Sequence, residues 1–96
     1  MRRTEIKFNL PVSILKENKS FVAYTPALDL STSGQSYAEV KKRFEEIVSI
    51  FFEELVKKGT LEEVLRELGW KKISAGWRPP VVIAHNLETF QVPVNV

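Results

Sequence analysis

The sequence predicts a small α+β domain, in which an antiparallel β-meander is covered by one long and one short helix and completed by a C-terminal strand. Apolar and polar residues alternate near both ends of the chain, which is typical of strands with one buried face. Two central segments repeat apolar residues at helical spacing, and each begins with a capping signal. The expected order of elements is therefore β-β-β-α-α-β.

Three strands are expected in the first third of the chain. The first is expected over residues 5–15, where apolar residues recur at every second position from 6 to 14, although Pro11 lies among them and cannot donate a ladder hydrogen bond. A polar turn joins this strand to a second strand over residues 21–25, and residues 28–32 can return as a third. These three segments predict the meander.

A long amphipathic helix is expected after the third strand. Ser36 and Glu39 form a capping box, in which the Ser36 hydroxyl accepts from the Glu39 N–H and the Glu39 carboxylate accepts from the Ser36 N–H. Lys57 and Lys58 lie in the last turn, where they stabilise the helix dipole, and Gly59 supplies the left-handed stop. The apolar stripe is wide enough to cover a sheet and consists of Val40, Phe44, Ile47, Val48, Phe51 and Leu55.

A second, shorter helix is expected directly behind the first. Thr60 and Glu63 form another capping box, and Gly69 is the expected stop. Its buried stripe consists of Leu61, Val64, Leu65 and Leu68.

The C-terminal part is expected to be a loop over residues 70–80 followed by one strand. The apolar residues of segment 90–96 alternate with polar ones, and Pro93 favours an edge position for this strand. A helical crossover that returns beside the first strand would make the two strands parallel. Pairing with a neighbouring subunit fits the pattern equally well.

Composition places the chain among single-domain globular proteins. Its 96 residues can bury one modest core, and a net charge of +2 is too small to indicate a nucleic-acid partner. The absence of cysteine excludes disulfides and thiolate metal sites. Neither a secretory signal nor an apolar stretch long enough to span a bilayer is present. We therefore expect residues 1–96 to form one soluble, cytoplasmic domain.

No catalytic or metal-binding motif is recognisable. His85 is the single histidine and lies in a polar segment, so a solvated or hydrogen-bonded imidazole is expected rather than a general base. The predicted order of elements resembles a truncated ribonuclease H sheet, but such nucleases place several carboxylates around two divalent ions. Asp29 is the single aspartate, and most glutamates are expected on exposed helix faces, paired with Lys or Arg. Neither an enzyme nor a cofactor site is expected.

The best candidate binding surface is the loop between the short helix and the Pro-Pro pair. Trp77 lies near Lys71, Lys72 and Arg78, and this combination could stack on bases or anchor a protein partner. Trp70 directly follows the helix stop and is expected to pack over the open end of the core. For Trp77 the sequence leaves both roles open.

The stretch from residue 21 to residue 40 resembles the beginning of the HicB-like antitoxins. That family shows a strand, a Pro-x-Leu bend, a short polar strand, a Gly-x-Ser/Thr turn and a helix with an acidic cap. The corresponding segments here are FVAY at 21–24, PAL at 26–28, STS at 31–33, GQS at 34–36 and AEV at 38–40. The similarity covers residues 1–55, and the later Gly-Trp and Trp-x-Pro-Pro are similar to longer stand-alone members.

The resemblance implies a cytoplasmic, non-catalytic antitoxin that binds a small HicA-type toxin, an RNA-cleaving protein, and masks its active face. It also implies a homo-oligomer, because family members commonly assemble through their sheets. Many members continue into a DNA-binding helix-turn-helix or ribbon-helix-helix, which has no counterpart in these 96 residues. Asp29-Leu30 replaces the usual small-residue turn, and a mildly basic chain needs a local acidic patch to meet a basic toxin.

Three functional hypotheses result. The first is an interaction protein of the HicB type. The alternative is a nucleic-acid-binding module that uses Trp77, Lys71, Lys72 and Arg78. A degenerate nuclease that retains Asp29 is the third.

Overall fold

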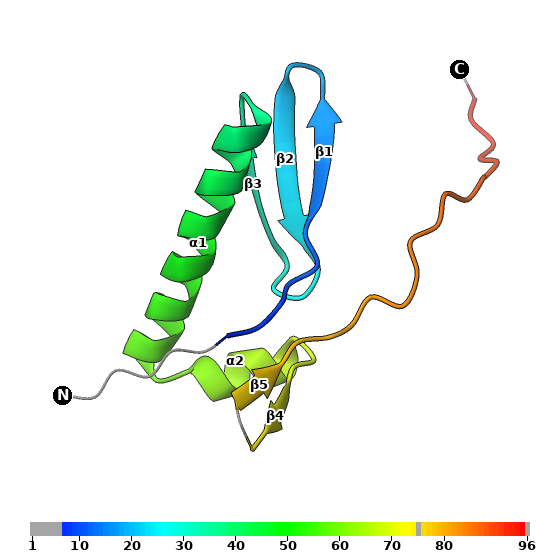
Figure 1. Cartoon of the computed structure of the whole chain (residues 1–96). Coiled ribbons are helices and arrows are strands. Elements are labelled where there is room, and N and C mark those ends of the chain that lie inside the picture. The colour runs from blue at the N-terminus through cyan, green and yellow to red at the C-terminus, as the bar shows by residue number, and fades with distance from the viewer. Residues whose placement is uncertain (1–6, 75, 96) are drawn as a thin grey trace.

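The computed structural model describes residues 7–74 and 76–95. A three-stranded antiparallel sheet is followed by two helices, a two-stranded hairpin and an extended C-terminal segment (Figure 1). The elements are β1 (Ser13–Glu17), β2 (Ser20–Thr25), β3 (Leu30–Gly34), α1 (Tyr37–Lys58), α2 (Leu61–Glu67), β4 (Lys71–Ile73) and β5 (Gly76–Arg78). This arrangement confirms the predicted α+β class, with a meander covered by one long and one short helix. A ribonuclease H sheet is not confirmed, because no fourth strand joins β1–β3 within the described residues.

The first strand begins later than predicted. It was expected over residues 5–15, of which residues 5 and 6 lie outside the described residues, and β1 instead covers Ser13–Glu17. Pro11 explains the shift, because its ring removes the N–H that a strand would use and the chain becomes regular only behind it. Five residues of β1 then pair with β2 in antiparallel register.

The third strand is shifted as well. It was expected over residues 28–32, whereas β3 covers Leu30–Gly34. A four-residue turn precedes it, and Asp29 in this turn has a left-handed backbone with φ of 51°. The Tyr24 hydroxyl donates a hydrogen bond of 3.2 Å to Asp29 Oδ1. The turn buries Leu28 in the core instead of placing it in the strand.

The long helix agrees with the prediction at both ends. The Ser36 hydroxyl accepts from the Glu39 N–H at 3.0 Å, as expected for the first half of a capping box. The Glu39 carboxylate accepts from the Gln35 N–H at 3.1 Å, one residue earlier than predicted. Gly59 closes the helix with φ of 70°.

The start of α2 corrects the prediction of a second capping box. Thr60 makes no side-chain capping bond, and its backbone is not in the extended conformation that a capping residue adopts. Its N–H instead donates to the Leu55 carbonyl at 2.9 Å, beside a bond from Gly59 to Val56. Thr60 therefore completes the end of α1.

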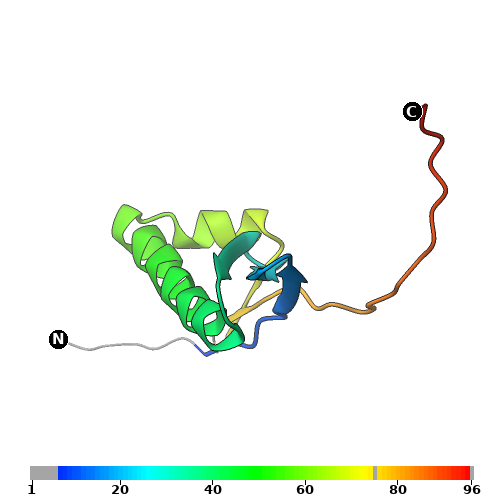
Figure 2. The same ribbon diagram turned by 90° about the horizontal axis from the view of Figure 1, so that it is seen from above.

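The helix α1 packs along one face of the sheet (Figures 1 and 2). Ala23 of β2, Val40 and Phe44 form a buried cluster between these layers. Where β3 ends, the backbone of Gly34 lies so close to the helix that an added Cβ would be 2.9 Å from the Val40 nitrogen. The sheet and α1 are in direct backbone contact at this point.

A second buried cluster joins α2 to the turn before β3. It consists of Ala27, Leu28, Leu65 and Trp70. Phe8, which was expected in the first strand, packs on this cluster and places its ring 5.1 Å from that of Trp70. The segment before β1 is thereby fixed to the body of the domain.

The C-terminal region corrects two predictions. The predicted loop at 70–80 contains the β4–β5 hairpin, and the predicted strand at 90–96 is not formed over its described residues. Residues 79–95 carry no regular structure and lead away from the body on the side of β1 (Figures 1 and 2), while Val96 lies outside the described residues. A strand needs a neighbouring backbone to bond to, and this segment has none within the described chain. Neither helix is long and apolar enough to cross a membrane.

Candidate interaction surface

The β4–β5 hairpin brings the four candidate residues together. Lys71 is opposite Arg78 and Lys72 is opposite Trp77 in the antiparallel register. Successive residues of a strand point to opposite faces, so the two pairs lie on different faces of the hairpin. One face carries two exposed cations, and the other carries a cation and a half-buried indole.

The face with Trp77 is docked on α2 by a small charged network. The Arg66 guanidinium carbon lies 5.6 Å and the Lys72 ammonium 5.9 Å from the centroid of the Trp77 ring. Glu62 accepts from Arg66 at 3.0 Å and lies 3.5 Å from Lys72. The indole is thus in contact with cations of its own chain, which favours a packing role for Trp77 over base stacking.

The charge of Glu62 holds this network together. The hydrogen bond from Arg66, and next the nearby charge of Lys72, lower the pKa of Glu62 below its ordinary value of 4.5. The carboxylate therefore stays ionised at neutral pH, where it can hold both cations over the ring.

Trp70 has the core role that the sequence predicts. Its side chain is buried, and its indole N–H donates to the Ala27 carbonyl at 2.8 Å. The bond joins the residue after α2 to the turn before β3. Trp70 is therefore not part of a binding surface.

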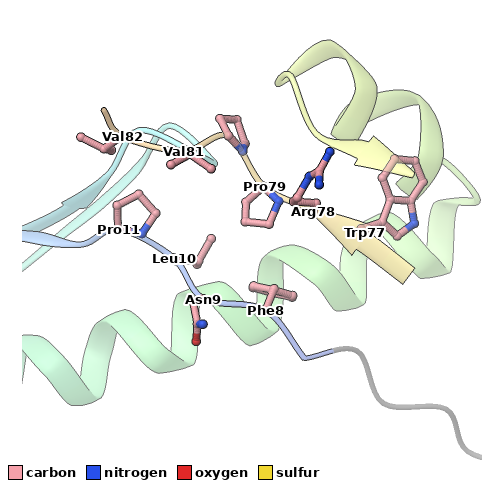
Figure 3. A pocket seen from close by; sticks show the side chains of 10 residues that line it. Phe8, Asn9, Leu10, Pro11, Trp77, Arg78, Pro79, Val81 and Val82 are labelled. Atoms are coloured by element: carbon pink, nitrogen blue, oxygen red, sulfur yellow. The ribbon is translucent and has the colours of Figure 1, made fainter. Parts of the chain in front are cut away.

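An open groove lies between two segments that are far apart in the sequence. One wall is residues 8–11, before β1, and the other is residues 77–82, after the hairpin (Figure 3). The groove has a volume of about 580 Å³. Leu10 and Pro11 line it from one wall, and Pro79 and Val82 line it from the other (Figure 3). This groove was not predicted from the sequence, because residues 8–11 were expected to lie in a strand. Pro11 and the Pro79-Pro80 pair were the available signals that these segments are not paired strands.

The extended segment 79–95, which begins in the groove wall, carries half of the exposed large apolar side chains of the described chain. Those in its first part are Val81, Ile83 and Leu87. In its second part Phe90, Val92 and Val94 are 80%, 73% and 68% exposed, and they alternate with polar residues and Pro93. The alternation predicted from the sequence is therefore present on a segment that has no partner strand in the described chain.

The other residues that were considered for chemistry lie apart. His85 is exposed in the extended segment, and Asp29 lies in the turn before β3, beside Tyr24. Within residues 7–74 and 76–95, no group of three or more His, Cys, Asp or Glu side chains is placed to hold a metal ion.

Comparison of the chain with protein-family models, with curated proteins and with solved structures found no match. The resemblance to HicB-like antitoxins consequently depends on the order and spacing of the segments between residues 21 and 40, and it stays a prediction. In the structure these segments form β2, the turn, β3 and the capped start of α1.

Proposed function

We propose that the chain is a non-catalytic interaction protein of the HicB antitoxin type. In this proposal it acts in the cytoplasm as a homo-oligomer and masks a small HicA-type, RNA-cleaving toxin. The observation that carries a binding role is the exposed apolar segment 81–95 beside an open groove, since surfaces of this kind usually mark protein interaction sites. The strand, bend, strand and capped helix over residues 21–58 support the HicB type.

The surface that suits a basic toxin lies on α1. A shallow hollow on this helix is lined by Lys42, Glu45, Glu46, Ser49 and Ile50. Ile50 is exposed, so an apolar side chain lies beside two carboxylates. An apolar anchor with adjacent negative charge is complementary to a surface that binds RNA. We assign toxin contact to this hollow.

Co-expression with the small reading frame beside the gene tests the proposal. We expect the neighbour to arrest growth alone, and the chain to restore growth and to co-purify with it. A variant with Glu45→Lys and Glu46→Lys should fail on both counts. A variant with Glu63→Lys and Glu67→Lys, both exposed on α2, has the same net charge, and it should rescue growth. A neighbour without toxicity, or rescue by all variants alike, would contradict the proposal.

Nucleic-acid binding is the second candidate, and one observation favours it. Lys71 and Arg78 are cross-strand neighbours and both are exposed, so they form a compact cationic face suited to phosphate. Binding through this face should weaken steeply as salt is added. A variant with Lys71→Glu and Arg78→Glu should lose it, whereas Lys41→Glu with Lys42→Glu on α1 should retain more. Affinity for oligonucleotides that is absent or independent of salt would exclude this role.

A further inference from the structure

We propose that residues 89–95 of one copy add as a fourth strand to the outer edge of β1 in a second copy, so that two copies exchange their C-terminal segments. From the proposed function this inference takes only the homo-oligomer, and it does not depend on toxin binding. What is new is the surface through which the copies are joined.

The donor segment has the pattern of a strand with one buried face. Phe90, Val92 and Val94 occupy alternate positions, so in an extended chain their side chains lie on one face and their backbone N–H groups on one side. Pro93 lies between Val92 and Val94, so the N–H that it lacks would have pointed to the other side of the strand. The segment can bond to a neighbouring strand on the side of the apolar residues without losing a hydrogen bond at Pro93.

The acceptor is the edge of β1 that faces away from β2. The sheet order is β1-β2-β3, so β1 and β3 are its two edges. At the β3 edge, Arg43 of α1 donates to the Ser33 carbonyl at 3.0 Å and already covers part of the strand. At the β1 edge Leu15 is 53% exposed. The edge of β1 is thus the more accessible one, and it carries an apolar side chain for the added strand to cover.

The length of the chain between the groove and Phe90 favours β1 of a second copy, and not β1 of the same copy, as the strand to which residues 89–95 add. The extended segment begins at the groove that Pro11 and Val82 both line, close to the start of its own β1. The five residues of β1 span about 17 Å, whereas an extended chain from Val82 to Phe90 covers about 26 Å. A segment that followed its own β1 would pass the end of that strand before reaching Phe90. The observed path leaves the sheet on the side of β1 (Figures 1 and 2), in reach of another molecule.

Pro93 also limits the size of the assembly. Once residues 89–95 have been added, they form the new edge of the sheet, and Pro93 presents no N–H on its outer side. A proline at an edge disfavours addition of a further strand. Reciprocal exchange between two copies satisfies both acceptor edges, so a closed two-fold dimer is expected rather than an open filament.

The molar mass of the full chain tests the exchange. Sedimentation equilibrium should show a dimer, and replacing Phe90, Val92 and Val94 by Ser should raise the dissociation constant by about a hundredfold or more. Replacing Thr89, Gln91 and Asn95 by Ser is the matched control, because it changes the other face of the same strand and should leave the dimer intact. Both triple variants change exposed positions outside the core, and circular dichroism will confirm that they fold. A monomeric wild-type chain, or equal effects of the two triple variants, would overturn the proposal.

Cross-linking distinguishes exchange from pairing within one copy. The chain has no cysteine, so single cysteines can be introduced without interference. An isotope-labelled copy with Val92→Cys is mixed with an unlabelled copy with Leu15→Cys and treated with a flexible bismaleimide. We expect labelled-to-unlabelled products, and far fewer when Lys57→Cys, on α1, replaces Leu15→Cys. A chain with both cysteines that links only within itself would refute the exchange. The readouts contain no toxin, so failure of the antitoxin proposal leaves them unchanged.

Discussion

At the scale of single residues, Trp70 connects three parts of the domain. Its indole N–H bonds to the carbonyl of Ala27, and its ring meets that of Phe8 edge to face at 5.1 Å. It also packs against Phe52 of α1 at 6.1 Å. One side chain therefore joins the chain behind α2 to the turn before β3, to the segment before β1 and to the long helix.

Replacing Trp70 by Phe should lower the free energy of unfolding by about 1–3 kcal/mol, because the buried Ala27 carbonyl loses its donor. Urea unfolding measures the change. Trp77→Phe is the control, since Trp77 is half-buried and lies at the hairpin surface, and it should cost less. Equal stabilities of the two variants would contradict the role given to the Trp70 hydrogen bond.

Position 34 requires glycine because there is no room for a side chain, and not because of its backbone conformation. A Cβ at this position would lie 2.9 Å from the Val40 nitrogen and 3.1 Å from its Cα, and both are backbone atoms that cannot turn aside. Gly34→Ala should therefore destabilise the fold by about 1–3 kcal/mol, as overpacking does. In thermal unfolding this corresponds to a loss of about 4–8 °C for each kcal/mol. Ser33→Ala, at the neighbouring exposed position, should change the midpoint little; a Gly34→Ala protein as stable as wild type would show that the helix is farther from β3.

At the scale of elements, the hairpin is held on α2 by charges that titrate. The pKa of Glu62 is lowered in the folded state, so its contribution is fully present above the ordinary value of 4.5 and is lost as the pH falls through the folded pKa. The indole resonance of Trp77 should therefore shift in acid, as Arg66 and Lys72 leave the ring.

Glu62→Gln should abolish this acid-dependent shift and give at neutral pH a spectrum like that of the acidified wild type. Nuclear magnetic resonance of the Trp77 indole measures it. Glu63→Gln is the matched control on the same helix, because the ion pairs of both cations are with Glu62, and it should keep the transition. If the acid-dependent shift persists in Glu62→Gln, it arises from the titration of another group.

The elements that the sequence predicts best are those whose ends depend on local chemistry. The bounds of α1 follow from a capping hydroxyl at Ser36 and a left-handed Gly59, which act within a few residues. The role of Thr60 was not predictable in the same way, because this residue lies between two helices. Its N–H bonds to the Leu55 carbonyl at the end of α1, and its side chain does not cap α2. The strand shifts arise from Pro11 and from the left-handed Asp29, whose effects on register depend on the partner strand.

The candidate site was predictable only in part. The cations and Trp77 were identified from the sequence, but strands of three residues are too short for periodicity to reveal the hairpin that orders them. The groove depends on residues 8–11 meeting residues 77–82, and no local pattern encodes a contact between such distant segments. The alternation at 90–95 led to the prediction of a strand that the described chain does not form, because periodicity does not show whether a partner strand is present.

At the scale of the whole molecule, the extended segment dominates the shape. The radius of gyration is 16.7 Å and the longest dimension is 61 Å, against about 13 Å for the radius of gyration of a compact domain of this length. Burying one apolar side chain contributes about 1.5–3 kcal/mol, so three from each of two copies give about 9–18 kcal/mol. Association costs about 4–15 kcal/mol. A single segment would contribute about 4.5–9 kcal/mol, which offsets only the lower part of this cost, whereas reciprocal exchange of two segments offsets its whole range.

The most direct test of the central claim, that the C-terminal segment is a binding strand, is amide hydrogen exchange of the full chain at concentrations where copies associate. If the segment adds to β1, exchange should be slow at Phe90, Val92 and Val94, whose N–H groups would bond to β1, and fast at Gln91 and Asn95. Dilution should remove the protection. Fast exchange at all five amides at every concentration would show that the segment adds to no strand, because an unbound segment protects none of them.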